Sequence, residues 1–131
     1  MTYCLDTNVM IALMRNRKPV VDRLRTLSPV QVKVPEVVRA ELAFGCLKSA
    51  HPNQETSKVD QVLAPFERLP FSGDAVEHYA AIRLDLEKRG LMIGPNDLLI
   101  AATARAGCMV MVTTNDREFS RVPGLVVENW E

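Results

Sequence analysis

Four acidic residues stand at positions where an unpaired charge would be costly. Asp6 ends the first apolar segment, and Asp116 follows a later apolar segment by a few residues. Glu41 and Asp97 fall on helical stripes that are otherwise apolar, so their carboxylates should face the interior. Acids that converge repel one another without a counter-charge, and Mg²⁺ and Mn²⁺ prefer ligation by oxygen alone. The pattern predicts a divalent metal site.

Each acid also has a simpler structural interpretation. Asp6 is typical of a turn that starts a helix, and the residues around Asp116 have ordinary turn composition. Glu41 could form a salt bridge at the rim of the core with Lys48, two helical turns further on. Asp97 lies in the first turn of its helix, where the helix dipole alone favours an anion by up to ~1 kcal/mol.

One short stretch of the chain is strongly basic. Between positions 15 and 25 there are five basic residues and a single acid, Asp22. We interpret Arg15, Arg17 and Lys18 as substrate-binding residues, and the alternative is a solvated helix face. The whole chain has 16 basic and 16 acidic residues, a balance that by itself argues against a nucleic-acid partner. If cations neutralise the four acids, the rest of the chain is mildly basic.

The remaining reactive residues form no other catalytic pattern. His51 and His78 lack partners at zinc-ligand spacing, the three cysteines form no CxxC pair, and no Gly-x-Ser-x-Gly elbow is present. No apolar run approaches the ~20 residues of a membrane span, and the first residues do not show the basic stretch followed by an apolar one that is typical of a signal peptide. We therefore expect no membrane association and a reducing, cytoplasmic location.

These residues must be positioned by strands and helices that alternate along the chain. A length of 131 residues suits one domain. Apolar strands interleaved with helices predict an α/β domain with a mainly parallel central sheet and helices on both faces. Asn8 is predicted to cap a helix, residues 51–55 to form a loop, Gly90 to end one helix and Pro95 to start the next. The predicted strands are 3–6, 30–34, 69–71, 108–112 and 125–127, and the predicted helices are 9–14, 19–27, 35–48, 58–66, 74–89 and 97–106.

Four motifs occur in an order and at separations that are specific when taken together. They are Leu5-Asp6-Thr7-Asn8, Val37–Gly45, Gly94–Ala102 and Thr113–Phe119, the last followed by Pro123-Gly124-Leu125. Through these motifs the chain resembles the PIN-domain ribonucleases, and among them the VapC toxins of bacterial toxin–antitoxin modules. The resemblance covers essentially the whole chain and implies a PIN-like fold, with one PIN-like nuclease domain over residues 1–131.

The resemblance also implies roles for the acids. Asp6, Glu41 and Asp97 match the family's three core acids, and Asp6 and Asp97 match its direct Mg²⁺ ligands, with Mn²⁺ able to substitute. Relatives vary between Asp and Asn at the fourth position, so Asp116 is expected to be a ligand, to support the water shell of the ion, or to be dispensable. The matching supporting polar positions are Thr7, Asn8 and Thr114.

The activity implied by this resemblance is metal-assisted hydrolysis of RNA phosphodiester bonds. Asp6 and Asp97 are expected to hold the cation while Glu41 orients or deprotonates the attacking water. Asp116 is expected to support a second ion or the waters of the first. The resemblance further implies a structured RNA substrate, tRNA in particular, a cognate VapB-type antitoxin that covers the acids, and a homodimer.

Two other functions remain open on the sequence. A non-catalytic PIN relative that only binds RNA or an antitoxin would keep the fold, but loss of activity is hard to reconcile with a complete set of acids. A receiver-type phosphorylation domain also has Mg²⁺-binding acids, but it would carry adjacent acids after the first strand, where this chain has Asp6-Thr7-Asn8. The sequence favours a metal-dependent endoribonuclease.

Overall fold

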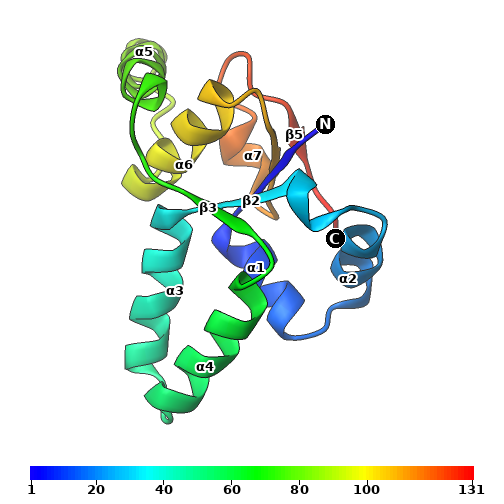
Figure 1. Cartoon of the computed structure of the whole chain (residues 1–131). Coiled ribbons are helices and arrows are strands. Elements are labelled where there is room, and N and C mark those ends of the chain that lie inside the picture. The colour runs from blue at the N-terminus through cyan, green and yellow to red at the C-terminus, as the bar shows by residue number, and fades with distance from the viewer.

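The computed structural model describes residues 1–131 as five strands and seven α-helices (Figure 1). The strands form one sheet in the order β3-β2-β1-β4-β5, and every strand pair is parallel. A 3₁₀ turn, Pro29–Gln31, precedes β2. In chain order the elements are β1 (Tyr3–Leu5), α1 (Thr7–Met14), α2 (Lys18–Arg25), β2 (Val32–Pro35), α3 (Glu36–Lys48), α4 (Pro52–Leu63), β3 (Glu67–Leu69), α5 (Asp74–Arg89), α6 (Pro95–Ala106), β4 (Val110–Val112), α7 (Asp116–Phe119) and β5 (Val127–Glu128).

Helices cover both faces of the sheet. The steps from β1 to β2 and from β2 to β3 move in one direction across the sheet, whereas the step from β3 to β4 returns past β2 and β1. Because connections between parallel strands are right-handed, α1 to α4 cover one face and α5 to α7 cover the other, as Figure 1 shows. The predicted fold class, a parallel α/β sheet with helices on both faces, is therefore confirmed.

The central strands are apolar because helices cover both faces of the sheet. β1 and β4 are buried along their whole length, as parallel strands packed on both faces must be. They contribute to a core of 30 buried apolar residues. Helix α6 is buried on most of its sides and contributes to the same core. None of the helices combines the length and the apolar composition that crossing a bilayer requires.

The winding of the sheet reverses beside β1. The chain leaves β1 toward β2 on one side and leaves β4 toward β5 on the other, so a crevice opens between the carboxyl ends of β1 and β4. Leu5 pairs with Val112, and the Asp6 N–H donates to the Val112 carbonyl oxygen at 2.9 Å. The crevice is therefore bordered by Asp6 on one strand and Thr113 on the other.

Two local predictions at helix starts are wrong. Residues 51–55 are not a loop, because α4 already begins at Pro52, where a proline loses no hydrogen bond through its missing N–H. Asp6, and not Asn8, caps α1. Both errors have the same cause: residues that favour turns are also the residues that favour the first positions of a helix.

Other boundaries follow the local chemistry of the chain more closely. Gly90 ends α5 in the left-handed conformation, with φ at 66°, and Pro95 is the first residue of α6, as predicted. β3 lies at Glu67–Leu69, two residues earlier than the predicted 69–71. This edge strand pairs only with β2, so its register is decided by that partner and not by its own weak pattern.

The C-terminal segment is held against β1 and α2 by aromatic packing. Trp130 is 7% exposed, and its ring centroid lies 5.8 Å from that of Tyr3. The Arg23 guanidinium lies over both rings, 5.4 Å from the centroid of Tyr3 and 5.5 Å from that of Trp130. Such cation–π contacts strengthen when partly buried, so they fix α2 to the C-terminal segment.

We expect Trp130→Ala to lower the free energy of unfolding by about 3 kcal/mol, because it removes a buried aromatic side chain and its partner contacts. Val126→Ala is a matched control on the same segment, since Val126 is 60% exposed and its loss should change stability by less than about 0.5 kcal/mol. Urea denaturation of the purified proteins measures both values. Equal effects of the two substitutions would contradict the packing described for Trp130.

Candidate functional site

Asp6 is a buried carboxylate, 4% exposed, at the carboxyl end of β1. Both of its oxygens accept hydrogen bonds: Oδ1 from the Thr7 backbone N–H at 2.8 Å, and Oδ2 from the Thr113 hydroxyl at 2.8 Å. The first bond caps α1, and the second joins the start of α1 to the end of β4. Asp6 is thereby fixed in the crevice between β1 and β4.

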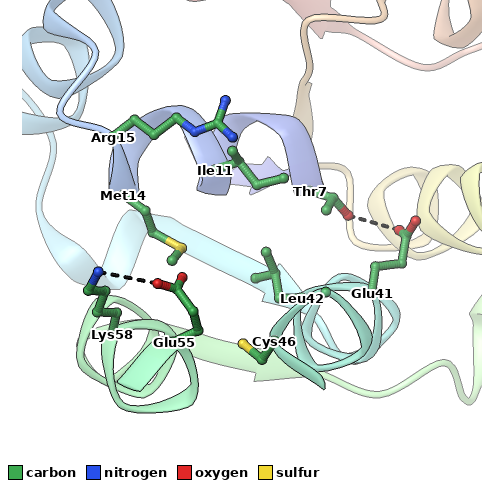
Figure 2. Close-up of a pocket in the computed structure, with 10 residues that line it drawn as sticks. Thr7, Ile11, Met14, Arg15, Glu41, Leu42, Cys46, Glu55 and Lys58 are labelled. Atoms are coloured by element: carbon green, nitrogen blue, oxygen red, sulfur yellow. Dashed lines mark hydrogen bonds and ion pairs between the residues drawn. The ribbon is translucent and has the colours of Figure 1, made fainter. Parts of the chain in front are cut away.

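Glu41 reaches the same crevice from α3. Its Oε1 accepts a hydrogen bond from the Thr7 hydroxyl at 2.8 Å (Figure 2). The side chain is half-buried and adjoins the buried Leu42, as its place on the helical stripe predicts. The alternative rim salt bridge does not form, because the Lys48 ammonium lies over the Phe44 ring, 5.1 Å from its centroid.

Asp97 and Glu118 complete the cluster from the other face of the sheet. Asp97 is the third residue of α6, and Glu118 lies on α7, where Asn115 Nδ2 donates to Glu118 Oε2 at 2.6 Å. Burial first, then a hydrogen bond with Glu118, and then the negative charges of Asp6, Glu118 and Glu41 raise the pKa of Asp97 to about 7. The four acids therefore share one electrostatic environment.

Hydrogen bonds connect three of the four acids in one continuous series. Burial raises the pKa of Asp6, hydrogen bonds from Thr113 and Thr7 oppose that rise, and the charges of Glu41 and Glu118 add to it. No Lys or Arg forms an ion pair with any of the four acids. Carboxylates gathered in this way favour either protonation or a bound cation. The hydrogen-bonded series that connects three of these acids runs, in order, through Glu41, Thr7, Asp6, Thr113, Asn115 and Glu118.

The structure does not bring Asp116 into this cluster. Asp116 is exposed at the start of α7, and its one side-chain hydrogen bond comes from Asn129 Nδ2 at 3.4 Å. Glu118 lies two residues later, about 200° further around the helix, so only one of the two can face the crevice. Sequence reasoning missed Glu118. The signal that could have identified it is the neighbouring Phe119, which is buried and therefore marks the inward side of α7.

The three predicted substrate-binding residues have different surroundings. Lys18 pairs with Asp22 on its own helix, and Arg17 pairs with Glu131 at 2.6 Å. Arg15 forms no ion pair, is exposed at the C-terminal end of α1, and lines the same cavity as Glu41. Figure 2 shows its guanidinium lying along α1, above Ile11. Arg15 is therefore the member of this group that is most free to contact a ligand.

Two cavities border Glu41. The first, of about 430 Å³, lies between α1, α3 and α4, with Ile11, Met14 and Leu42 among its lining residues. Figure 2 shows Glu41 at one end of it and the ion pair of Glu55 with Lys58 at the other. The second, of about 640 Å³, lies between α1, α3 and α6. Glu41 is thus accessible to a ligand that lies along α3.

The raised pKa of Asp97 has a consequence for the metal-free protein. The folded state binds the Asp97 proton more tightly than the unfolded state, so stability should fall as the pH rises from about 4 to about 7. Asp97→Asn removes this decline and, after allowance for solvent screening, should raise the melting temperature at pH 7.5 by about 4 °C. Thermal unfolding in chelator at pH 5.5 and 7.5 measures it, with the exposed Asp60→Asn as the control. A lower melting temperature for Asp97→Asn would contradict the repulsion.

Comparison with known proteins gives one consistent result. Residues 3–125 match the PIN domain family. The chain is 38% identical to ribonuclease VapC2 of Rickettsia felis, over all of this chain and 99% of that protein. It is 31% identical to the tRNA(fMet)-specific endonuclease VapC of Salmonella typhimurium, over 98% and 97% of the two chains. The structure superposes on a chain of DNA-bound VapBC2 from Rickettsia felis with a TM-score of 0.94 at 36% identity, covering both chains completely. The chain therefore belongs to the PIN domain family, among the VapC ribonucleases.

Proposed function

We propose that this protein is a divalent-metal-dependent endoribonuclease that acts as the toxin of a VapBC-type pair. The observation that carries the proposal is the group of four acids without a basic partner at the switch point of the sheet. Asp6, Glu41, Asp97 and Glu118 come from four separate parts of the chain and repel one another, as the raised pKa of Asp97 reflects. A fold gains nothing in stability from such a group, so its use is functional.

The chemistry of the donors suits Mg²⁺ or Mn²⁺. As the side chains lie, no three acidic, His or Cys side chains are close enough to ligate one ion. Mg²⁺ takes one or two protein carboxylates and keeps several waters, so two acids are sufficient. Asp6 and Asp97 are the pair that we propose as ligands, because Asp6 is held rigidly and Asp97 has the stronger need of a counter-charge.

Each acid has a defined part in phosphodiester hydrolysis. A bound divalent cation would lower the pKa of a water and stabilise the charge that develops on the phosphate. Glu41, oriented by the Thr7 hydroxyl, would direct the attacking water and accept its proton. Glu118, held by Asn115, would keep the Asp97 carboxyl in position. The geometry favours Glu118 over Asp116 as the fourth acid.

The substrate that we propose is a structured RNA. Relatives from Salmonella typhimurium and Shigella flexneri are named tRNA(fMet)-specific endonucleases, and they align over 98% of this chain. Arg15, which lines the same cavity as Glu41, supplies an unpaired cation for the RNA backbone. tRNA is therefore the first substrate class to test, and the cytoplasm, where tRNA occurs, remains our expected location.

We also propose a VapB-type antitoxin as the partner. Several of the most similar solved structures are VapBC complexes, from Rickettsia felis, Salmonella typhimurium and Haemophilus influenzae. The cavity between α1, α3 and α4 has an apolar wall and ends at Glu41, so it suits an apolar segment that carries a basic residue toward the acids. The homodimer expected from the resemblance remains a prediction.

The activity is tested by incubating the purified protein with total RNA. We expect endonucleolytic cleavage with Mn²⁺ or Mg²⁺ and none in chelator, with Asp6→Asn inactive and the exposed Asp60→Asn as active as the wild type. RNA that is bound but not cut by the wild type would favour the non-catalytic alternative. If the wild type neither binds nor cuts RNA, the ribonuclease assignment is refuted.

The fourth acid is tested by comparing two substitutions on α7. Glu118→Gln should lower Mn²⁺-dependent cleavage about 10- to 100-fold, as is typical when a residue that positions a metal ligand is changed. Asp116→Asn should retain activity within about twofold, because Asp116 is exposed and does not contact the cluster. The opposite ranking of the two variants would restore Asp116 as the fourth acid.

A further inference from the structure

A polar cavity lies along α1, adjoining the cavity that ends at Glu41, with which it shares Ile11 and Arg15. It has a volume of about 260 Å³, and five of its seven lining residues are polar or charged. Two arginines, an amide and a hydroxyl converge there, together with one carboxylate. The polar lining residues are Asn8, Arg15, Arg17, Thr114 and Glu131.

The backbone places this cavity next to the metal-binding acids. Asn8 directly follows Thr7, whose N–H and hydroxyl bind Asp6 and Glu41. Thr114 directly follows Thr113, whose hydroxyl binds Asp6. Residues that line the cavity therefore directly follow residues that hydrogen-bond the acids in two segments, the start of α1 and the loop after β4. An acidic centre that needs a cation lies beside a basic cavity that suits an anion.

The donors in the cavity match a phosphate group. Guanidinium groups bind phosphate oxygens through planar pairs of hydrogen bonds, and amide and hydroxyl groups complete such sites. Arg15 has no acidic partner, so its charge is available. Arg17 does have one, the carboxylate of Glu131 at 2.6 Å. An anion therefore already lies in the cavity, and it belongs to the chain itself.

The fold positions Glu131 in this cavity. Its backbone N–H donates to Asn129 Oδ1 at 2.9 Å, and the preceding Trp130 is buried against Tyr3. The Glu131 side chain is 25% exposed, less than half the 56% exposure of the Arg17 side chain. The carboxylate thus has a fixed place, but the ion pair stays open enough to water to be weak and displaceable.

We propose that this cavity is the subsite for an RNA phosphate adjacent to the scissile one, and that the Glu131 carboxylate occupies it until RNA displaces it. The inference rests on the proposed ribonuclease function and adds a device that regulates access to that site. Because the carboxylate and the phosphate compete for Arg17, RNA binding must break the pair of Arg17 with Glu131. The free protein accordingly binds RNA less tightly than its basic residues allow.

The test measures RNA binding without cleavage. Fluorescence anisotropy with labelled tRNA in chelator compares the wild type, Glu131→Gln, Arg17→Gln and the double variant. Glu131→Gln should tighten binding about two- to fivefold, the range that corresponds to losing one exposed ion pair. It should also steepen the salt dependence, because Arg17 then contacts the backbone more fully. In the Arg17→Gln background the same change should give no gain.

Glu87→Gln is the matched control. Glu87 also forms an exposed ion pair with an arginine, Arg83, on α5, so this variant removes the same charge from a similar ion pair at another place. Its affinity should stay within about 1.5-fold of the wild type, since one distant charge is largely screened. Equal gains for Glu131→Gln and Glu87→Gln, or a gain that persists without Arg17, would overturn the proposal.

Failure of this inference can be told apart from failure of the proposed function. If the wild type cuts RNA but Glu131→Gln binds it no better, the ribonuclease assignment stands and the competition by Glu131 is refuted. If the wild type does not cut RNA and Glu131→Gln still tightens binding only when Arg17 is present, the basic cavity is supported and the nuclease function is refuted.

Discussion

The site depends on one buried carboxylate that is held from two directions. Asp6 is almost completely removed from water, which would be costly for a free charge, and it is compensated by hydrogen bonds from the Thr7 backbone N–H and the Thr113 hydroxyl. These two bonds join β1, α1 and β4 at the point where the sheet reverses its winding. From there the hydrogen bonds continue to Glu41 on α3 and, through Asn115, to Glu118 on α7. Helices from both layers are thus connected to Asp6 by hydrogen bonds.

This arrangement makes the metal-free site unfavourable by itself. Like charges are brought together where water cannot screen them well, and the raised pKa of Asp97 is the clearest sign of that repulsion. The fold tolerates it because a core of 30 apolar residues stabilises the sheet that carries the acids. Arg15 and Arg17 line a cavity together with Asn8 and Thr114, the residues that follow Thr7 and Thr113, so negative and positive charge gather in neighbouring parts of a chain whose net charge is zero. Such a division suits a ligand that combines phosphates with a divalent cation.

Much of the fold was predictable because its signals are local. Pro95 and Gly90 set helix boundaries through backbone geometry alone, and the fully apolar segments around β1 and β4 indicated strands covered on both faces. The start of α4 at Pro52 was mispredicted, because proline and polar residues are as common in loops as in the first turn of a helix. Those two environments differ only in what the following residues pack against.

The sequence by itself determined which acids could meet. Asp6 at the end of a strand, Glu41 on an apolar stripe and Asp97 in the first turn of a buried helix have positions that any parallel α/β packing brings to one edge of the sheet. Only the tertiary structure decided the rest. It placed Glu118, and not Asp116, on the side of α7 that faces the crevice, because the burial of Phe119 in the core fixes the orientation of this helix. It also paired Arg17 with Glu131, 114 residues away, since an ion pair between distant segments depends on how the chain returns to itself and not on any local pattern.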